Sequence, residues 1–336
     1  MSAAPRPILG LALVLASGLM LSQCGGGSPT APQTITVVES TPVTTTPPTQ
    51  TQIPGPATQP EVAPPTTPPV PAIPGTASVS VNVLGDTGWC GSPALGPIAR
   101  LFERFDGEIL LAGDLAYPSG TIEEFRNCFE PHFGRFKSRM RASPGNHDYV
   151  ASPTADSYFN YFGDRAGPNR LGYYSFRAGE WTIFMLNSSV PIGRHSAQLA
   201  YVRDVMQQRP TRCTAAVLHH PFDSSGVNGP SPFLRDMWEL IYNLNGDVVI
   251  AGHDHLYERH APVDASQRRD DVRGIRQFTV GTGGAPLYNR VRAALNSELF
   301  IATYGMLRLK LDPASYEWQF MDMNGNVLDR GLNVCH

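Results

Sequence analysis

Short apolar runs that end in polar loops recur along the central part of the chain. Each run is rich in Val, Ile, Leu or Ala, and a loop with Asp, Asn or His follows it directly. Strands that are covered on both faces of a sheet read as continuous apolar runs rather than as alternating patterns. The sequence therefore predicts buried strands at 79–84, 109–112, 142–144, 215–218 and 247–251.

Helical patterns lie between several of these runs, and the expected helices span 121–128, 197–207 and 232–244. Apolar strands that alternate with helices predict an α/β sheet with covered faces. Further strand-like segments alternate without long helices between them, and they predict a second, partly antiparallel sheet. These segments are 173–176, 181–186, 277–280, 306–311 and 316–321.

The N-terminal residues, 1–24, have the pattern of an export signal. Arg6 precedes an apolar run at 8–21, which is shorter than the roughly 20 residues of a spanning helix and fits a signal peptide. The run ends in a sequence that resembles a bacterial lipobox, in which Cys24 would be lipidated. Gln23 departs from that pattern, because small residues usually precede the cysteine. The alternative is an ordinary cleaved signal with an incidental cysteine.

The next segment, 25–75, is rich in proline and threonine. From 28 to 75, 26 of 48 residues are Pro or Thr. Such a composition cannot bury enough apolar surface to offset the entropy lost on folding. The sequence therefore predicts a disordered linker, which would act as a stalk if Cys24 is anchored in a membrane and as a passive linker otherwise.

The remaining 261 residues, 76–336, fit one large α/β domain. Without the leader and linker (Arg6, Glu39 and Glu61), the domain has 25 basic and 27 acidic residues. This balance lacks the basic footprint of a nucleic-acid-binding protein. The sequence also has no Gly-x-Ser-x-Gly motif, so it gives no support for a serine hydrolase.

Four cysteines remain in this domain, and an even number in an exported chain favours disulfides. They are Cys90, Cys128, Cys213 and Cys335. None has the spacing of a CxxC metal site. Three pairings are open, and we expect Cys90–Cys128 with Cys213–Cys335, partly because the first pair flanks loops that should meet at the active site.

The polar loops after the predicted strands carry side chains that bind metals. Ligands of open α/β sheets lie outside the carboxyl ends of the strands, so these loops should converge. Asp, Asn and His together suit first-row metal ions, and a carboxylate that bridges two ions about 3.5–4 Å apart suits phosphoryl transfer. The loops are Gly-Asp-Thr-Gly at 85–88, Gly-Asp-Leu-Ala-Tyr at 113–117, Gly-Asn-His-Asp at 145–148, His-His-Pro at 219–221 and Gly-His-Asp-His at 252–255.

In this order, the motifs resemble those of purple acid phosphatases, a branch of the calcineurin-like metallophosphoesterases. The resemblance covers 84–259, and the segment GHDHLYER at 252–259 is especially typical. It implies a two-sheet α-β-β-α sandwich with a binuclear centre of Fe(III) and a divalent ion, which is Fe, Zn or Mn.

The resemblance also implies a role for each ligand. Asp86, Tyr117 and His255 would hold the ferric ion, Asp114 would bridge the two ions, and Asn146, His219 and His253 would hold the divalent ion. Tyr117 is the discriminating residue, because Fe(III) favours a phenolate ligand. The alternative for Tyr117 is an ordinary core aromatic.

Two positions depart from the family pattern. Val usually stands three residues before the fourth-motif histidine, and Ala216 holds that position if His219 is the ligand, whereas Val217 would make His220 the ligand. Pro221 favours His219. Asn228 and Gly229 stand where many family members carry a further substrate-binding histidine, so His220 or Asn228 would take that role.

The resulting prediction is hydrolysis of phosphate monoesters by a metal-bound hydroxide. Asn146 and the metals would stabilise charge, His147 would protonate the leaving oxygen, and Asn146, His147 and His220 would contact a phosphorylated small-molecule or ester substrate. The alternatives are a phosphodiesterase with the same site and a surface binding protein on this scaffold. The expected location is a bacterial cell surface if Cys24 is lipidated, and otherwise the periplasm or the exterior.

Overall fold

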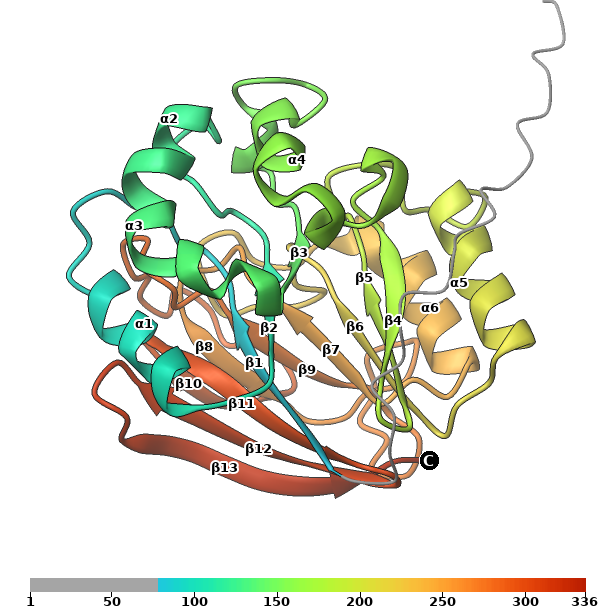
Figure 1. The fold of residues 1–336 in the computed structure, drawn as a ribbon. Helices are drawn as coiled ribbons and strands as arrows, with labels where there is room; N and C mark the ends of the chain where they lie inside the picture. The colour runs from blue at the N-terminus through green and yellow to red at the C-terminus, as the bar shows by residue number, and fades with distance from the viewer. Residues whose placement is uncertain (1–77) are drawn as a thin grey trace, which may run out of the picture. The chain divides into compact units, whose positions relative to one another are not determined.

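The computed structural model describes residues 78–336, which form two β-sheets packed face to face with helices on the outer faces (Figure 1). This arrangement confirms the predicted α-β-β-α sandwich. The predicted signal segment and linker lie outside the described residues. Among the helices of the described part, none has the length and apolar character needed to cross a membrane.

The first sheet has six strands in the order β13-β12-β11-β1-β2-β3. Its strands are β1 (Val79–Leu84), β2 (Glu108–Ala112), β3 (Met140–Ser143), β11 (Gly305–Asp312), β12 (Ser315–Asp322) and β13 (Val327–Val334). Strands β1, β2 and β3 are parallel. Strand β11 pairs antiparallel with β1, and β12 and β13 extend that half of the sheet as an antiparallel meander.

The second sheet has seven strands in the order β10-β8-β9-β7-β6-β5-β4. Its strands are β4 (Tyr174–Ala178), β5 (Trp181–Met185), β6 (Cys213–Val217), β7 (Val248–Ala251), β8 (Tyr257–His260), β9 (Arg276–Val280) and β10 (Ser297–Ile301). Strands β5, β6, β7 and β9 are parallel. Strands β4, β8 and β10 add antiparallel pairs toward the edges.

Helices cover both outer faces of the sandwich. The helices of the first face are α1 (Leu95–Arg104), α2 (Ile122–Glu124), η1 (Phe125–Phe129), α3 (Glu130–Phe133), η2 (Gly134–Arg139), η3 (His147–Tyr149), α4 (Asp156–Phe162), η4 (Gly163–Ala166) and η5 (Pro168–Arg170). The second face carries α5 (Ala197–Gln208), η6 (Pro232–Leu234) and α6 (Arg235–Asn243). Figure 1 shows α5 and α6 side by side on one flank, with α1 to α4 on the other side.

The strand sequences explain this layering. Successive side chains of a strand point to opposite faces, so Leu110 packs into the core between the sheets, while Ile109 and Leu111 pack under the helices of the first face. In β7, Ile250 likewise packs between the sheets and Val249 packs against α5 and α6. Because both faces of β2 and β7 are covered, these strands carry apolar residues at nearly every position.

The predicted division of strands between the two sheets is wrong. Segments 306–311 and 316–321 belong to the first sheet as β11 and β12, while β6 and β7 lie in the second. Strand pairing depends on hydrogen bonds between segments far apart in the chain, which local patterns do not encode. The expected helix at 121–128 is also interrupted, because a π-helical turn, η1, follows the short helix α2.

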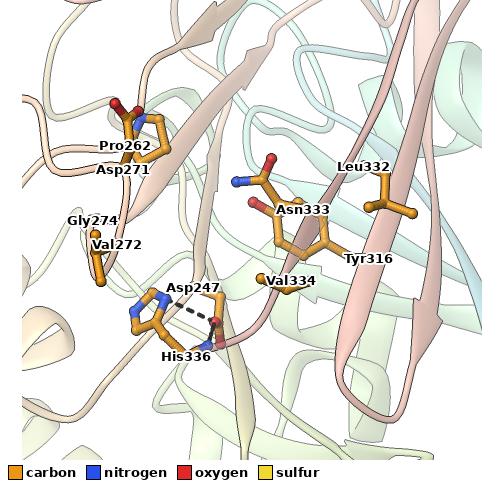
Figure 2. Close-up of a pocket in the computed structure, with 10 residues that line it drawn as sticks. All are labelled: Asp247, Pro262, Asp271, Val272, Gly274, Tyr316, Leu332, Asn333, Val334 and His336. Carbon is orange, nitrogen blue, oxygen red and sulfur yellow. Dashed lines mark hydrogen bonds and ion pairs between the residues drawn. The ribbon is translucent and has the colours of Figure 1, made fainter.

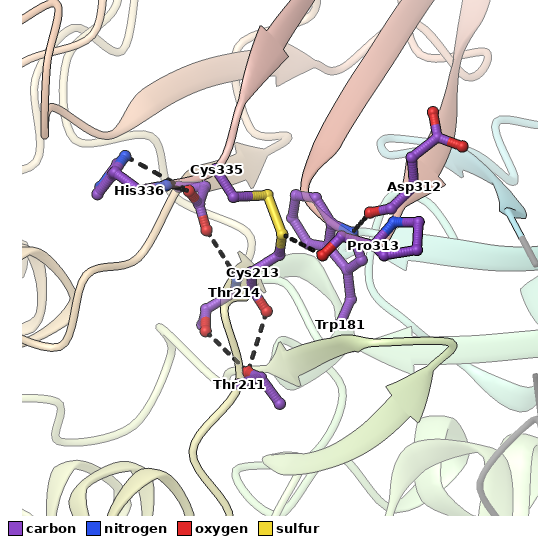
Figure 3. The surroundings of a disulfide bond; sticks show 9 residues. Trp181, Thr211, Cys213, Thr214, Asp312, Pro313, Cys335 and His336 are labelled. Carbon is purple, nitrogen blue, oxygen red and sulfur yellow. Dashed lines mark hydrogen bonds and ion pairs between the residues drawn. A yellow bond between two sulfur atoms is a disulfide. The ribbon is translucent and has the colours of Figure 1, made fainter. Parts of the chain in front are cut away.

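Two disulfides confirm the predicted pairing, Cys90–Cys128 and Cys213–Cys335. Figure 3 shows the second, which joins the start of β6 to the residue after β13. The backbone N–H of Cys335 also donates to the Ala314 carbonyl at 2.8 Å. This disulfide therefore links the two sheets at the end of the sandwich where β6 begins.

Loss of the Cys213–Cys335 disulfide is expected to destabilise the domain more than loss of Cys90–Cys128. The two bonds close segments with sequence separations of 122 and 38, and a longer closed loop removes more entropy from the unfolded chain. The chain-entropy relation gives a difference of about 1 kcal/mol in the free energy of unfolding. Urea unfolding of the two double Cys→Ser variants measures it, and equal midpoints and slopes would contradict the prediction.

A cavity of about 340 Å³ lies near this disulfide (Figure 2). Asp247 and His336 line it, with the His336 Nδ1 atom 3.4 Å from a carboxylate oxygen of Asp247. Asp247 stands just before β7, whereas the loop at 252–255 follows β7. The cavity and the predicted metal ligands therefore lie at opposite ends of this strand.

Candidate metal centre

The loops that follow the parallel strands of both sheets meet at one end of the sandwich. The backbone N–H of Asp86 donates to the Gly113 carbonyl at 3.0 Å, and Gly252 donates to the His219 carbonyl at 2.9 Å. Across the sheets, the N–H of His253 donates to the Asp86 carboxylate at 2.8 Å. The third loop joins them through the N–H of His147, which donates to the Asp114 carboxylate at 2.8 Å.

Glycine is required at two points of this contact region. Gly113 has a φ of +79°, and a Cβ atom there would lie 2.6 Å from the His219 ring. A Cβ atom at Gly145 would overlap the carboxylate of Asp114. The glycines before Asp114 and Asn146 therefore allow the loops to approach closely enough to share one site.

One half of the cluster is centred on the hydroxyl of Tyr117. It donates to the Asp86 carboxylate at 2.8 Å, and its oxygen also lies 3.1 Å from both the Asp114 Oδ2 and the His255 Nε2 atoms. The Tyr117 side chain is buried, with 3% of its surface exposed. Its hydroxyl therefore faces three of the other predicted ligands.

The other half is centred on the Nε2 atom of His219. This atom lies 3.0 Å from the Asn146 Oδ1, 3.1 Å from the Asp114 Oδ2 and 3.1 Å from the His253 Nδ1. The ligand atoms of Asp114, His219 and His253 all lie within 4.8 Å of one another. The Asp114 Oδ2 atom therefore contacts Tyr117 in one half of the cluster and His219 in the other.

Hydrogen bonds behind the cluster fix the orientation of its side chains. The Nδ1 atoms of His219 and His255 lie 2.9 and 2.8 Å from the carbonyl oxygens of Ala112 and Pro286. A proton on each Nδ1 atom makes a hydrogen bond to these carbonyls. Each Nε2 atom then stays unprotonated, with its lone pair directed toward the centre. Outer carbonyls of this kind commonly set the tautomer of metal-binding histidines.

Asp148 holds two of the loops in register from behind. Its carboxylate accepts hydrogen bonds from the backbone N–H groups of Asp114, Leu115 and Gly145. Burial and then the neighbouring Asp114 raise the pKa of Asp148 to about 7. No role for Asp148 was expected from the sequence, although this residue directly follows the Asn-His pair of the third motif.

The electrostatic field of the cluster stabilises positive charge. Burial alone lowers the pKa of His219, but Asp114 and then Asp86 raise it, and the resulting pKa is about 9. Burial raises the pKa of Asp114, but His219 and His147 together lower it by more. The pKa of Asp114 therefore lies below its usual range. A cation at this point is therefore favoured by the surrounding carboxylates.

The donor chemistry of the cluster fits metal ions. With Nδ1 of His219 bonded outward, the atoms Asn146 Oδ1, Asp114 Oδ2, His253 Nδ1 and His219 Nε2 converge as electron-pair donors. Such a group can be satisfied by a proton on His219 or by a cation that accepts several lone pairs. Carboxylate, amide oxygen and imidazole are ligands of first-row metals.

His147 lies at the rim of the cluster. Its backbone N–H donates to the Asp114 carboxylate at 2.8 Å, and its Nδ1 lies 2.6 Å from the Pro118 carbonyl. The Nε2 atom is 3.9 Å from Asp114 Oδ2, and 35% of the side chain is exposed. Nε2 therefore faces the centre from a position that solvent and substrate can reach.

His220 lies beside the cluster rather than in it. Its Nδ1 is 2.8 Å from the Ser188 hydroxyl, and its ring centre is 4.4 Å from that of His253. Burial, His219 and His253 lower the pKa of His220 to about 2. This geometry favours His219 over His220 as the ligand. Asn228 donates its side-chain amide to the His253 carbonyl at 2.9 Å, so that group supports the ligand loop.

His260 and the glycine-rich loop at 281–284 lie near the cluster without belonging to it. His260 is buried, with Nε2 3.3 Å from Glu258. The loop at 281–284 lies against the first ligand loop, because the N–H of Gly283 donates to the Gly85 carbonyl at 2.9 Å. It is therefore a tight turn next to the centre.

Two aromatic residues near the centre were not foreseen from the sequence. Trp89 packs on Tyr117 with ring centres 5.3 Å apart, and Tyr288 stacks on His255 at 4.1 Å. Trp89 immediately follows the first motif, which is a signal that could have been used. Tyr288 lies 33 residues after His255 in the sequence, so only the fold brings it to the site.

The two-sheet sandwich with a His, Asp and Asn cluster at the strand ends defines a metallophosphoesterase scaffold. The family model of the calcineurin-like phosphoesterases matches residues 79–257, and the chain belongs to this family. Within it, the chain is similar to purple acid phosphatases.

Purple acid phosphatase 21 of Arabidopsis thaliana is 27% identical over 273 residues, which cover 73% of this chain and 59% of that protein. The Fe(3+)-Zn(2+) purple acid phosphatase 12 of the same plant is 26% identical over 211 residues, covering 56% of this chain and 44% of that protein. The chain thus aligns with about half the length of these relatives.

The fold is similar to that of the purple acid phosphatase PPD1 from yellow lupin (Lupinus luteus) seeds. The two structures have a TM-score of 0.68 and 18% sequence identity, and the match covers 76% of this chain and 53% of the lupin chain. This likeness concerns the architecture of the sandwich.

Proposed function

We propose that the chain hydrolyses phosphate monoesters at a binuclear metal centre. The observation that supports this most directly is the position of Asp114 Oδ2, which lies 3.1 Å from both the Tyr117 hydroxyl and the His219 Nε2 atom. One carboxylate between two sets of ligands is the arrangement that a bridged pair of ions requires. Similarity to purple acid phosphatases supports the same reaction.

The proposed ligands divide into two sets around Asp114. Asp86, Tyr117 and His255 would hold Fe(III), and Asn146, His219 and His253 would hold Fe, Zn or Mn as the divalent ion. Bound metals would supply an activated water and neutralise the charge of the phosphoryl group. The similarity to an Fe(3+)-Zn(2+) relative supports an iron-containing pair.

The side chains around the centre carry the remaining steps. The ester reacts with water, the bond from phosphorus to the leaving oxygen breaks, and His147 Nε2 donates a proton to that oxygen. The Pro118 carbonyl, 2.6 Å from Nδ1 of His147, holds the imidazole in this orientation. His220 lies beside His253 and is proposed to contact the phosphate from the other side.

We also propose that the chain is exported and that residues 76–336 form the catalytic domain. The two disulfides support an oxidising destination. Lipidation of Cys24 would anchor the chain at a bacterial surface, and residues 25–75 would then separate the domain from that surface. Mass spectrometry of the mature N-terminus tests the anchor, and an unmodified or removed Cys24 would contradict it.

Elemental analysis and a substrate panel test the proposed function together. We expect about two metal ions per chain, including iron, and faster turnover of monoesters than of the matched diesters. Preference for diesters would make the chain a phosphodiesterase with the same site. Metal binding without turnover of either class would favour the binding-protein alternative.

The Tyr117→Phe variant tests the iron ligand. Phenolate bound to Fe(III) absorbs visible light by charge transfer, so the purified protein should be pink to purple and the variant should lose that absorption. Tyr288→Phe is a matched control, because this tyrosine stacks on His255 outside the ligand set. Visible spectra at equal iron content measure the effect, and a variant that keeps its colour would remove Tyr117 from the ligand set.

A further inference from the structure

Exposed aromatic rings in this protein gather at the metal centre. Among the large apolar side chains exposed within residues 78–336, the only Phe, Tyr or Trp side chains are Trp89 at 36% and Phe233 at 51% exposure. Trp89 packs on Tyr117, and Phe233 packs on His220. Both exposed rings therefore lie against residues of the proposed site, where a substrate could contact them.

Trp89 lies on the side of the centre where the leaving group of the substrate is expected. The Tyr117 ring contacts Trp89 at 5.3 Å and His147 at 4.6 Å between ring centres. His147 is the residue proposed to protonate the leaving oxygen, so the leaving group lies on the His147 side of the centre. Trp89 and His147 are thus two neighbours of the same ring, and Phe233 lies on the side of His220 and His253 instead.

The backbone around Trp89 is held in a fixed shape. Its neighbour Cys90 is bonded to Cys128, which lies within the π-helical turn η1. The N–H of Ser92 donates to the Trp89 carbonyl at 3.1 Å, and a Cβ atom at Gly88 would overlap the Leu115 carbonyl. A ring that is fixed before binding loses little entropy when a ligand stacks on it.

We propose that Trp89 forms a stacking subsite for a planar aromatic ring in the leaving group. The preferred substrates are then monoesters of aromatic alcohols or nucleosides rather than of aliphatic alcohols. This inference rests on the proposed phosphomonoester hydrolysis and adds a substrate class to it. Stacking needs a flat π-surface but no particular hydrogen-bond pattern, so several ring types should be accepted.

Two substrate pairs test the subsite with matched leaving oxygens. Benzyl phosphate and cyclohexylmethyl phosphate are both primary alkyl esters of similar size, and only the first carries a planar ring. Adenosine 5′-monophosphate and ribose 5-phosphate differ by the nucleobase. The metal-loaded enzyme should favour the ring-bearing member of at least the first pair by about tenfold in kcat/KM, the range of one stacking contact. A preference in the second pair as well would identify nucleotides as substrates, and its absence would limit the subsite to small aryl groups.

Substitutions at Trp89 and Phe233 separate the subsite from general hydrophobic contact. Trp89→Ala should remove the preference within the benzyl pair, and Trp89→Phe should restore most of it. Phe233→Ala is the matched control, because it removes the other exposed ring and should leave the ratio of the pair unchanged. An unchanged ratio in Trp89→Ala, or an equal loss in Phe233→Ala, would overturn the proposal.

Equilibrium binding gives a second measurement that does not depend on turnover. The chain has four tryptophans, and the other three, Trp181, Trp238 and Trp318, are at most 5% exposed. Benzylphosphonate should therefore change the fluorescence of Trp89 more than cyclohexylmethylphosphonate does, and Trp89→Phe should lose this change. Equal responses would contradict the subsite, whereas failure to hydrolyse any ester would contradict the proposed function.

Discussion

Replacing Asp114 by asparagine is expected to lower the metal content from about two ions to below one per chain and to reduce kcat by more than about 10³-fold. Asparagine keeps the size of the side chain but removes the charge that both halves of the centre share. Asp114 Oδ2 lies 3.1 Å from Tyr117 on one side and from His219 on the other. Loss of this single carboxylate should therefore affect both metal positions.

Asp247→Asn is the matched control for this variant. Asp247 is also buried, with 2% of its surface exposed, but it lies before β7 at the opposite end of that strand. We expect its metal content and kcat to match those of the unmodified protein. Elemental analysis and circular dichroism of both variants compare metal loss with loss of fold. Normal metal content in a folded Asp114→Asn variant would contradict a bridged binuclear centre.

The His147→Ala variant should lose about 10²–10⁴-fold in kcat on alkyl phosphates, the usual range of general acid catalysis. Alkoxides are poor leaving groups that need a proton as the bond to phosphorus breaks. Nitrophenolate needs little protonation, so nitrophenyl phosphate should lose much less. The metal content should remain near that of the unmodified protein, because His147 belongs to neither set of proposed ligands.

The comparison of the two esters distinguishes proton donation from a structural role. A histidine that only supports the Pro118 loop would reduce kcat on both substrates by the same factor, which would remove His147 from the role of general acid. His195→Ala is the control, because His195 is exposed in the loop that precedes α5. It should leave both values of kcat unchanged.

The candidate ligands could be named from the sequence because each lies within a short motif after an apolar run. In the motif that contains Asp114 and Tyr117, two residues separate the two positions in the chain, and the Tyr117 hydroxyl lies 3.1 Å from the Asp114 Oδ2 atom. Local geometry of this kind is set by one strand end and one turn. The order of the motifs then added the resemblance to a family, which residue chemistry alone did not provide.

Other members of the site depend on contacts that the sequence does not reveal. Asp148 supports the backbone of Asp114, 34 residues away in the chain. Tyr288 stacks on His255 because its loop folds back onto that residue, where the N–H of Tyr288 donates to the His255 carbonyl at 2.9 Å. The sequence of the fourth motif also left either His219 or His220 as the candidate ligand. In the structure, Asn146 and Asp114 lie next to the Nε2 atom of His219, which favours His219.

The sequence by itself determined the covered α/β strands and the ligand-bearing loops, whereas it left three pairings of the four domain cysteines open. Apolar periodicity and turn residues act within a few positions, so they specify strands and the loops that follow them. Only the tertiary structure decided that β11 and β12 complete the sheet of β1, and that Trp89 stands exposed beside Tyr117. These features arise from hydrogen bonds and packing between segments distant in the chain, whose energies depend on the whole fold rather than on neighbouring residues.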